Sequence, residues 1–146
     1  MDISSQIDEM LDGPYWIIDI LPRQVPAQGG GQYFSVEQYI LNSSMMDTIC
    51  QRFAHLMLKI NCYEDIAVCL ADADEWTANP SPQTLTGWFL QQKPMNIWLK
   101  STGAMVAFCG DDHNLTYYSH QPVPQLIRDL AASENLFVWK PESEVK

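Results

Sequence analysis

The sequence has few basic side chains: eight Lys and Arg stand against eighteen Asp and Glu, for a formal net charge of −10 at pH 7. Nucleic-acid interfaces draw on clustered Lys and Arg to neutralise phosphates, and anionic membranes attract the same residues. We therefore expect neither nucleic acid nor a membrane as a partner. A basic protein or a cationic ligand suits this charge, because the summed field attracts positive groups. Alternatively, the charge serves only to keep the protein in solution.

Long apolar runs are also absent, and none approaches the roughly 20 residues that a membrane-spanning helix needs. The first residues, MDISSQIDEMLDG, show no basic region followed by an apolar stretch, which is the pattern of a secretory signal. We therefore expect a soluble protein of the cytoplasm.

The cysteines lack the CxxC spacing of zinc ribbons, and they do not form the dense pattern of a disulfide framework. There are four of them, Cys50, Cys62, Cys69 and Cys109. We expect buried, reduced thiols, and neither a metal nor another cofactor.

Catalytic signatures such as HExxH and the nucleophile elbow are missing, which leaves the glycine run in LPRQVPAQGGGQYFS (21–35) as a possible phosphate site. A dinucleotide fingerprint requires a third glycine where Phe34 stands, and a Walker loop requires a lysine after the glycines. We interpret Gly29 to Gly31 as a flexible bend and not as a phosphate cradle.

What the sequence does contain is enough apolar material for a packed core: 146 residues, 47% hydrophobic and 11% aromatic. Periodicity predicts helices at 3–12, 35–42, 43–60, 82–89 and 122–133, and strands at 15–21, 64–72, 96–100, 104–109, 115–119 and 135–140. The run at 64–72 is continuous, as in a strand covered on both faces. We predict a single α+β domain over 1–146, with a mixed, mostly antiparallel sheet of five to six strands and helices packed on it. We also expect an N-terminal helix within 1–12, a Pro/Gly loop at 22–34 and a frayed tail at 141–146.

Two helix starts carry local signals. Ser35 and Gln38 have the spacing of a capping box, with Phe34 and Tyr39 placed for a hydrophobic staple. Ser81 is the expected cap of the 82–89 helix, because Pro82 follows it at the first helical position.

The 43–60 helix has an apolar stripe that predicts a core-facing side, consisting of Met46, Ile49, Phe53, Leu56 and Ile60. Arg52, His55 and Lys59 form a small basic stripe on another side. We interpret the basic stripe as either a solvated flank or a binding surface.

The 22–34 loop is long for a compact domain, and such loops often carry function. Arg23, Gln24, Gln32 and Tyr33 suit polar recognition. Prolines stiffen the first half of the loop and glycines loosen the second, as a lid requires. The alternative is a plain surface loop.

The turn CGDDHN (109–114) brings together Asp111, Asp112 and His113, which could bind a divalent metal or perform acid–base chemistry. Hairpin turns use Asp, Asn and Gly in any case, so the turn is the simpler interpretation. His120 lies too far along the returning strand to complete a site, and Cys109 is expected to be inert packing in a strand.

Two further carboxylate positions are candidates. Asp72 and Asp74 follow the 64–72 strand, and ligand clefts in open α/β sheets lie beyond such strand ends. Asp19 stands in the apolar strand YWIIDIL, where burial would raise its pKa and make it a proton donor. An exposed sheet edge, or a hydrogen bond to a tyrosine hydroxyl, explains Asp19 more simply.

Two functional hypotheses follow. The first is a non-catalytic acidic binding protein that acts through a protein partner, with a basic protein among the candidates, or as a homodimer, because five Trp and six Tyr favour interfaces. It presumes that no set of ionisable side chains converges tightly enough for chemistry. The second is a small-molecule-binding protein or hydrolase-type enzyme with a pocket between the 22–34 loop and the sheet. A pocket bringing together two or more of Asp19, Asp72, Asp111 and His113, with perturbed pKa values, would favour the second.

Overall fold

The computed structural model describes residues 3–27 and 31–142 and confirms the α+β class. Its helices are α1 (Ile3–Leu11), α2 (Tyr33–Leu41), α3 (Met45–Asn61), α4 (Pro82–Leu90) and α5 (Gln125–Ser133). Its strands are β1 (Tyr15–Asp19), β2 (Ile66–Leu70), β3 (Thr77–Ala78), β4 (Met95–Leu99), β5 (Ala104–Phe108), β6 (Asn114–Tyr118) and β7 (Phe137–Trp139). Part of the predicted N-terminal helix (1–2), most of the glycine run (28–30) and the end of the predicted tail (143–146) lie outside the described residues.

The described strands form one sheet in the order β3-β2-β4-β5-β6-β1-β7, and all of its pairings are antiparallel. The predicted meander is confirmed, because β4, β5 and β6 pair in succession. The sheet has seven strands instead of five to six. The extra strand is β3, which spans only two residues and leaves no periodic pattern in the sequence.

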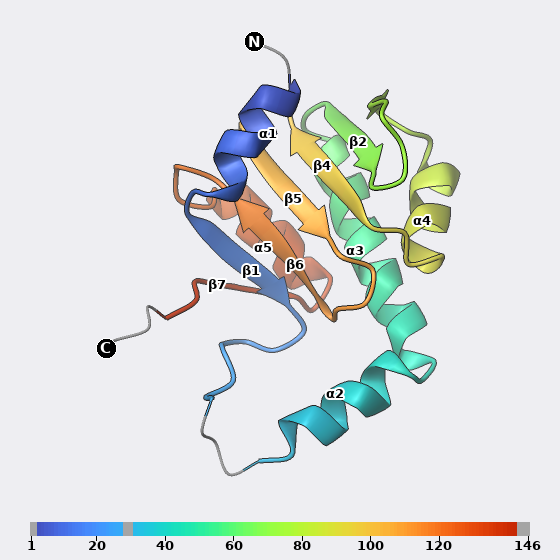
Figure 1. Ribbon diagram of the computed structural model, residues 1–146, viewed down its shortest axis with the longest axis vertical. Helices are drawn as coiled ribbons and strands as arrows, with labels where there is room; N and C mark the ends of the chain where they lie inside the picture. The colour runs from blue at the N-terminus through green and yellow to red at the C-terminus, as the bar shows by residue number, and fades with distance from the viewer. Residues whose placement is uncertain (1–2, 28–30, 143–146) are drawn as a thin grey trace.

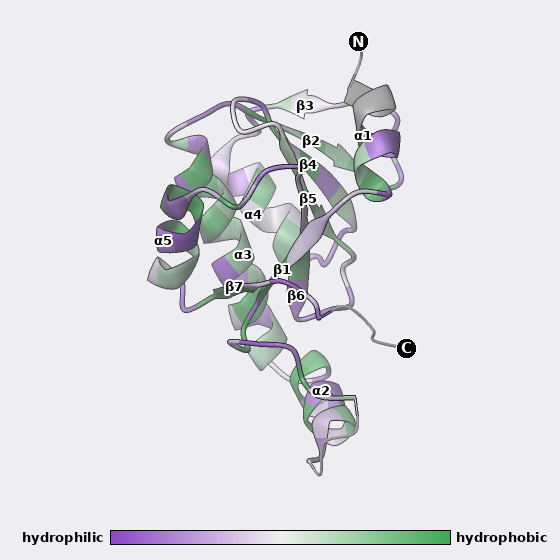
Figure 2. Cartoon of the chain, turned by 90° about the vertical axis from the view of Figure 1, so that its left-hand side faces the viewer, coloured by the Kyte–Doolittle hydropathy of each residue, from purple (hydrophilic) through white to green (hydrophobic). Residues whose placement is uncertain are grey.

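The helices lie on different sides of this sheet. α3, α4 and α5 cover one face, α1 lies against the other face, and α2 extends beyond one end of the strands (Figures 1 and 2). Figure 2 shows hydrophobic residues in both α3 and the strands, and the buried residues of α3 and of the strands belong to one core cluster. The loop between β1 and α2 therefore crosses from the sheet to a helix that has few neighbours.

The core lies between the sheet and α3, and the predicted stripe of α3 is confirmed. Alternate strand residues point into it: Ile66 and Val68 of β2 are buried, whereas Ala67 and Cys69 are half-buried. The expectation that β2 is covered on both faces is therefore wrong, because the second face of the sheet is only partly covered. Ile7 and Met10 of α1 are also buried but stand apart from the main core cluster.

The predicted start of α2 is wrong. The helix begins at Tyr33, so Ser35 lies inside its first turns, and no side chain caps the helix at Gln32. Phe34 and Tyr39, the expected staple, are 78% and 68% exposed. The cap of α4 is confirmed, because the amide of Thr84 donates to Oγ of Ser81 at 3.2 Å.

The basic stripe of α3 is not simply a solvated flank, because two of its residues contact the end of α5. His55 Nδ1 lies 3.2 Å and Lys59 Nζ 2.5 Å from the carboxylate of Glu134, the residue that ends α5. Two of the three basic residues are thus used to hold two helices together.

The cysteines are free, but only Cys50 is fully buried. Burial raises the pKa of its thiol to about 11, which keeps it protonated. Cys62 and Cys109 are exposed, because they follow the last residues of α3 and β5 and lie outside these elements. The expectation of buried thiols, including an inert packed Cys109, is wrong at these two positions.

Candidate functional site

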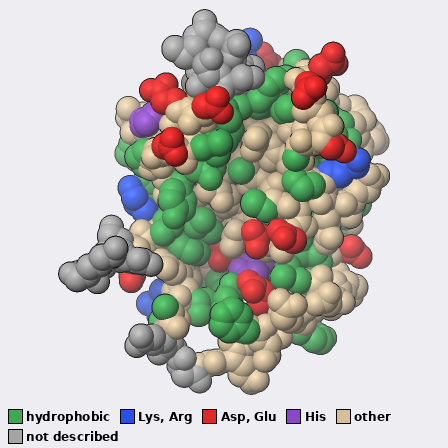
Figure 3. Space-filling view, in the orientation of Figure 1, with side chains coloured by type: hydrophobic (Ala, Val, Ile, Leu, Met, Phe, Trp, Pro, Cys, Tyr) green, Lys and Arg blue, Asp and Glu red, His purple; other side chains and the backbone are tan. Residues whose placement is uncertain are grey.

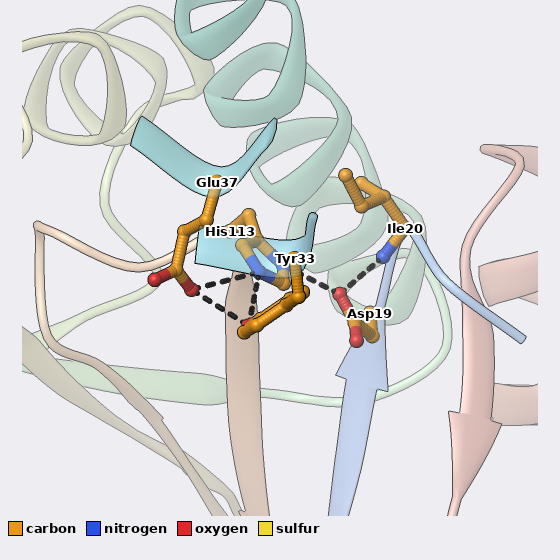
Figure 4. A network of polar contacts seen from close by, with 5 residues as sticks. All are labelled: Asp19, Ile20, Tyr33, Glu37 and His113. Atoms are coloured by element: carbon orange, nitrogen blue, oxygen red, sulfur yellow. Dashed lines mark hydrogen bonds and ion pairs between the residues drawn. The ribbon is translucent and has the colours of Figure 1, made fainter. Parts of the chain in front are cut away.

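A buried polar network lies where β1 ends and β6 begins (Figure 4). His113 Nδ1 is 2.8 Å from Oδ1 of Asp19, which also accepts a hydrogen bond from the amide of Ile20 at 2.7 Å. On the other side of the ring, Nε2 is 3.1 Å from the hydroxyl of Tyr33 and 3.3 Å from Oε2 of Glu37. The Tyr33 hydroxyl donates to that same Glu37 oxygen at 2.7 Å. Asp19 and His113 are 2% and 3% exposed.

Three separate segments bring these side chains together. Asp19 is the last residue of β1 and is the cross-strand partner of Asn114, so the residue before Asn114 lies beside the end of β1. Tyr33 and Glu37 stand one turn apart on α2, on the side that faces the sheet. The network therefore connects the protruding helix to the two strands.

A glycine shapes the loop that delivers His113. Gly110 has a φ of +90°, and a Cβ atom at this position would lie 2.4 Å from the carbonyl oxygen of Gln92. Only glycine adopts this backbone conformation without strain and allows such a close approach. The loop between β5 and β6 is thereby held against the segment that follows α4.

The electrostatics of the network favour a charged imidazole. The hydrogen bond to Asp19 raises the pKa of His113, and although burial opposes this, the charges of Asp19 and Glu37 raise it further. Burial and the hydrogen bond to Glu37 raise the pKa of Tyr33, so its hydroxyl stays protonated. Burial and the neighbouring Asp111 raise the pKa of Asp112. Figure 3 shows carboxylates on both sides of a histidine on this face, whereas Lys and Arg lie nearer its edges.

The hydrogen-bond pattern, together with the raised pKa of His113, favours a ring with a proton on both nitrogens. Nδ1–H donates to Asp19, and Nε2–H donates toward the Tyr33 oxygen and Glu37, while the Tyr33 proton is used by Glu37. A general base needs a free lone pair on a ring nitrogen. In that protonation state neither nitrogen of His113 offers one, and the ring connects the two strands to α2.

A cavity of about 440 Å³ adjoins the network. It lies between the 22–34 loop, the start of α2 and the side of the sheet where β1 and β7 pair. Its walls include Val25 and Ala27 of the loop, Tyr33 and Phe34 of α2, and Asp19 and Trp139 of the strands. Asp19 is among the lining residues, but its side chain is only 3% exposed and pairs with His113.

The structure brings some of the predicted site residues to this place. Tyr33 belongs to the network, and Gln24 lines the cavity and accepts a hydrogen bond from the amide of Glu142 at 2.8 Å. Arg23 and Gln32 are exposed. Of the turn residues, His113 is buried in the network, while Asp111 and Asp112 line a separate hollow together with Glu37. The turn is therefore part of a side-chain cluster and not only a hairpin connection.

Other predicted residues lie apart from it. Asp72 is exposed at the same end of the sheet, but β4, β5 and β6 separate its strand from β1. Asp72 lines a hollow of its own with Ala71, Lys93 and Pro94, at the end of a strand whose described pairings are antiparallel. His120 is confirmed as separate: it lies beside Gly13, at the other end of β6.

The simple explanations of Asp19 are wrong. β1 lies between β6 and β7 and is no edge strand, and the partner of Asp19 is an imidazole and not a tyrosine hydroxyl. Asp19, His113 and Glu37 do converge, and the presumption that no such set is tight enough for chemistry stays a prediction. Glu37 was not among the predicted site residues. Its only signal in the sequence is that it stands four residues after Tyr33 on the same helix.

Within the part of the chain that the structure describes, no three His, Cys, Asp or Glu side chains are grouped as a metal site would require. None of the described helices has the length and apolarity to cross a membrane.

No protein-family model matches the chain, and neither a curated protein nor a solved structure is significantly similar to it.

Proposed function

We propose that the protein is a non-catalytic binding protein and that its ligand occupies the cavity under the 22–34 loop. The observation that carries this proposal is the position of Asp19, which lines the cavity while it and Glu37 engage His113 on both ring nitrogens. A preorganised polar group at the floor of a concave, mostly apolar site is the usual arrangement of a ligand pocket.

Catalysis is the weaker explanation because the ionisable groups of the network already engage one another, Asp19 with His113 and Glu37 with Tyr33 and His113. A doubly protonated His113 has no free lone pair, and the raised pKa of Tyr33 keeps its hydroxyl a poor nucleophile. The described residues of the network include no serine, threonine or cysteine. What the network supplies is rigidity at the base of the cavity.

The size and lining of the cavity support binding. A volume of about 440 Å³ lies within the range of roughly 300–1,000 Å³ that is typical of small-molecule sites. One of its walls is the 22–34 loop, whose first part contains Pro22 and Pro26.

The test is a fragment screen by two-dimensional NMR on the intact chain. We expect binders to shift the amides of Asp19 and Ile20 and the indole signal of Trp139. Ala27→Trp should fill the cavity and abolish these shifts, because Ala27 is an exposed lining residue. Ala73→Trp, in an exposed loop elsewhere, is the matched control. The proposal is overturned if no fragment shifts these signals or if Ala27→Trp leaves binding unchanged.

A second candidate is recognition of a protein partner through α2. Phe34, Val36 and Tyr39 are 78%, 51% and 68% exposed on this protruding helix. Large apolar side chains that are exposed on one short helix are candidates for an interaction surface. Glu37 of the same helix lines a hollow with Asp111 and Asp112, and these carboxylates favour a basic partner, whereas a second copy would pair the apolar groups alone.

Sedimentation velocity over a range of concentrations tests the second-copy form of this candidate. We expect reversible self-association that Tyr39→Glu weakens, whereas Tyr63→Glu leaves it intact. Tyr63 is a suitable control because it is similarly exposed, at 65%, and lies after α3. A chain that stays monomeric throughout would exclude the homodimer and leave only a different, basic protein as partner for α2.

A further inference from the structure

A second cavity, of about 290 Å³, lies away from the polar network, on the side of the sheet where β3, β2 and β4 pair (Figure 1). All of its lining residues belong to the described part of the chain. Ala67 of β2 pairs with Ala78 of β3 and with Trp98 of β4, so these side chains project from the same face of the sheet. Trp76, two residues before Ala78, also lines the cavity. The cavity therefore has alanine methyl groups as its floor and an indole toward each side.

Asp65 and Lys100 form one end of this cavity. The amide of Lys100 donates to the carbonyl oxygen of Asp65 at 3.1 Å, which continues the pairing of β2 with β4 by one residue. Directly opposite residues of an antiparallel pair project from the same face, with their Cβ atoms roughly 5 Å apart. Both side chains are exposed, and neither takes part in an ion pair within the part of the chain that the structure describes. The cavity thus presents a carboxylate and an ammonium group side by side.

Asn79 orients the carboxylate of Asp65. Its φ of +44° is uncommon for a residue other than glycine, and four hydrogen bonds hold it there. Its amide donates to the carbonyl oxygen of Ile66 at 2.9 Å, and its Oδ1 accepts from the amide of Ile66 at 3.0 Å and from Nδ2 of Asn61 at 2.9 Å. Its Nδ2 donates to Oδ1 of Asp65 at 3.1 Å. Sparsely populated backbone conformations that are fixed by their surroundings cluster at ligand sites, and here the result is a preorganised polar end of the cavity.

This lining favours a small zwitterion with an apolar ring or chain. The indoles and the alanine floor suit a flat or branched apolar group, because aromatic faces pack against such groups. The charges suit a ligand that carries an ammonium and a carboxylate close together, since each would then meet a group of opposite sign. A cavity of about 290 Å³ is at the lower limit of the roughly 300–1,000 Å³ that is typical of ligand sites, so the ligand is small. A zwitterion also has no net charge, so the net charge of −10 on the protein does not repel it.

We infer that this second cavity binds a free α-amino acid with an aromatic or large aliphatic side chain. The side chain of the ligand lies between Trp76 and Trp98. Its α-ammonium group pairs with Asp65 and its α-carboxylate with Lys100, because both groups are attached to one carbon atom and the two counter-ions are cross-strand neighbours. A residue within a peptide chain lacks both charges, so the ligand is the free amino acid. The inference goes beyond the proposed function and does not depend on it, since the described linings of the two cavities have no residue in common.

The experiment uses four probes with one side chain on the intact protein: phenylalanine, phenylalanine amide, N-acetylphenylalanine and N-acetylphenylalanine amide. The first carries both charges, the second only the ammonium, the third only the carboxylate and the fourth neither. Dissociation constants come from NMR shifts of the Trp76 and Trp98 indole signals. We expect phenylalanine to bind about tenfold more tightly than the neutral probe, with the singly charged probes between them, because each partly exposed ion pair contributes modestly. Alanine, which lacks the ring, should bind too weakly to measure.

Two variants at exposed positions assign the charges. Lys100→Gln should bind phenylalanine no more tightly than phenylalanine amide, because the partner of the carboxylate is lost. Asp65→Asn keeps an oxygen that accepts from Asn79, and it should bind phenylalanine no more tightly than N-acetylphenylalanine, because the partner of the ammonium group is lost. Lys93→Gln, in a different hollow, is the control and should keep the order of affinities of the unaltered protein.

Two further variants locate the bound probe. Ala78→Trp should abolish the binding of phenylalanine, because Ala78 is an exposed lining residue and the larger side chain fills the cavity. Ala27→Trp, in the other cavity, should leave it unchanged, so failure of the proposed function does not affect this test. The inference is overturned if the neutral probe binds as tightly as phenylalanine, if no probe shifts either indole, or if Ala27→Trp abolishes the binding. Shifts of both indoles by glucose and not by phenylalanine would assign the cavity to a carbohydrate and would overturn it as well.

Discussion

His113 Nδ1 lies 2.8 Å from Oδ1 of Asp19, although 94 residues separate them in the chain, and each side chain is only 3% exposed. Buried charges of this kind are stable only when they are paired and hydrogen-bonded. Here the pairing continues through Nε2 to Glu37, so one imidazole connects β1, the loop before β6 and α2. We consider this connection the reason that α2 stays ordered against the sheet end while most of its surface is exposed.

The first prediction concerns the titration of His113. Because its hydrogen bond to Asp19 raises its pKa above the ordinary value of 6.5, the folded state binds this proton more tightly than the unfolded state. The stabilisation is fully present when the pH is below the pKa of His113 in the unfolded state. It is lost as the pH rises through the pKa of His113 in the folded state. Urea unfolding at successive pH values should show this loss, and NMR titration of the ring should report a pKa above 6.5.

His113→Asn should remove most of that pH dependence, whereas His120→Asn, at an exposed position, should leave it unchanged. A measured pKa of His113 at or below 6.5 would show that burial outweighs the two carboxylates and would contradict the doubly protonated ring.

The second prediction concerns Glu37. Glu37→Gln removes a negative charge from the Nε2 side of the ring, so the pKa of His113 should fall but stay above that of a ring without Asp19. The hydrogen bond from Tyr33 persists in weaker form, and we expect a loss of about 1 kcal/mol in the free energy of unfolding. Amide exchange should quicken in the first turn of α2 and not in α3. Glu75→Gln, at an exposed position, is the control, and an unchanged His113 titration would show that Glu37 does not interact with the ring.

Much of the fold was predictable because its elements carry strong local patterns. α3 has eight buried residues, among them all five of its predicted apolar stripe. β4, β5 and β6 are separated by short turns that allow only antiparallel neighbours. β3 was not predictable, because two residues form no period. The predicted start of α2 at Ser35 was wrong, although Ser35 has the right spacing for a cap. The helix begins two residues earlier, at Tyr33, whose hydroxyl contacts His113.

The site was predictable only in fragments. Asp19 and His113 each stood out, one as a carboxylate in an apolar strand and the other as an imidazole in an acidic turn. Their contact depends on β1 pairing with β6, which no local pattern specifies. Glu37 was invisible for the same reason, because a single glutamate on a helix is ordinarily solvated.

The third prediction concerns Tyr117, whose hydroxyl is buried without a hydrogen-bond partner among the described residues. An unsatisfied polar group in a core is destabilising, so Tyr117→Phe should raise the free energy of unfolding by about 1 kcal/mol while the edge-on contact with Trp16 is retained. Tyr118→Phe, on the half-buried side of the same strand, should change it by less than about 0.5 kcal/mol. A destabilised Tyr117→Phe would indicate that a buried water satisfies the hydroxyl.

The fourth prediction concerns the ion pairs between α3 and α5. Burial tends to raise the pKa of Glu134, but hydrogen bonds and charge from Lys59 and His55 outweigh it, so the pKa lies below the ordinary 4.5. The resulting stabilisation is present when the pH is above the pKa of Glu134 in the unfolded state. It is lost as the pH falls through the pKa of Glu134 in the folded state. Glu134→Gln should therefore cost roughly 0.5–1 kcal/mol at pH 7 and nothing near pH 3. Denaturant unfolding at both pH values checks this against Glu9→Gln, an exposed glutamate on α1. Equal losses at both pH values would mean that Glu134 acts through packing at the end of α5 and not through its charge.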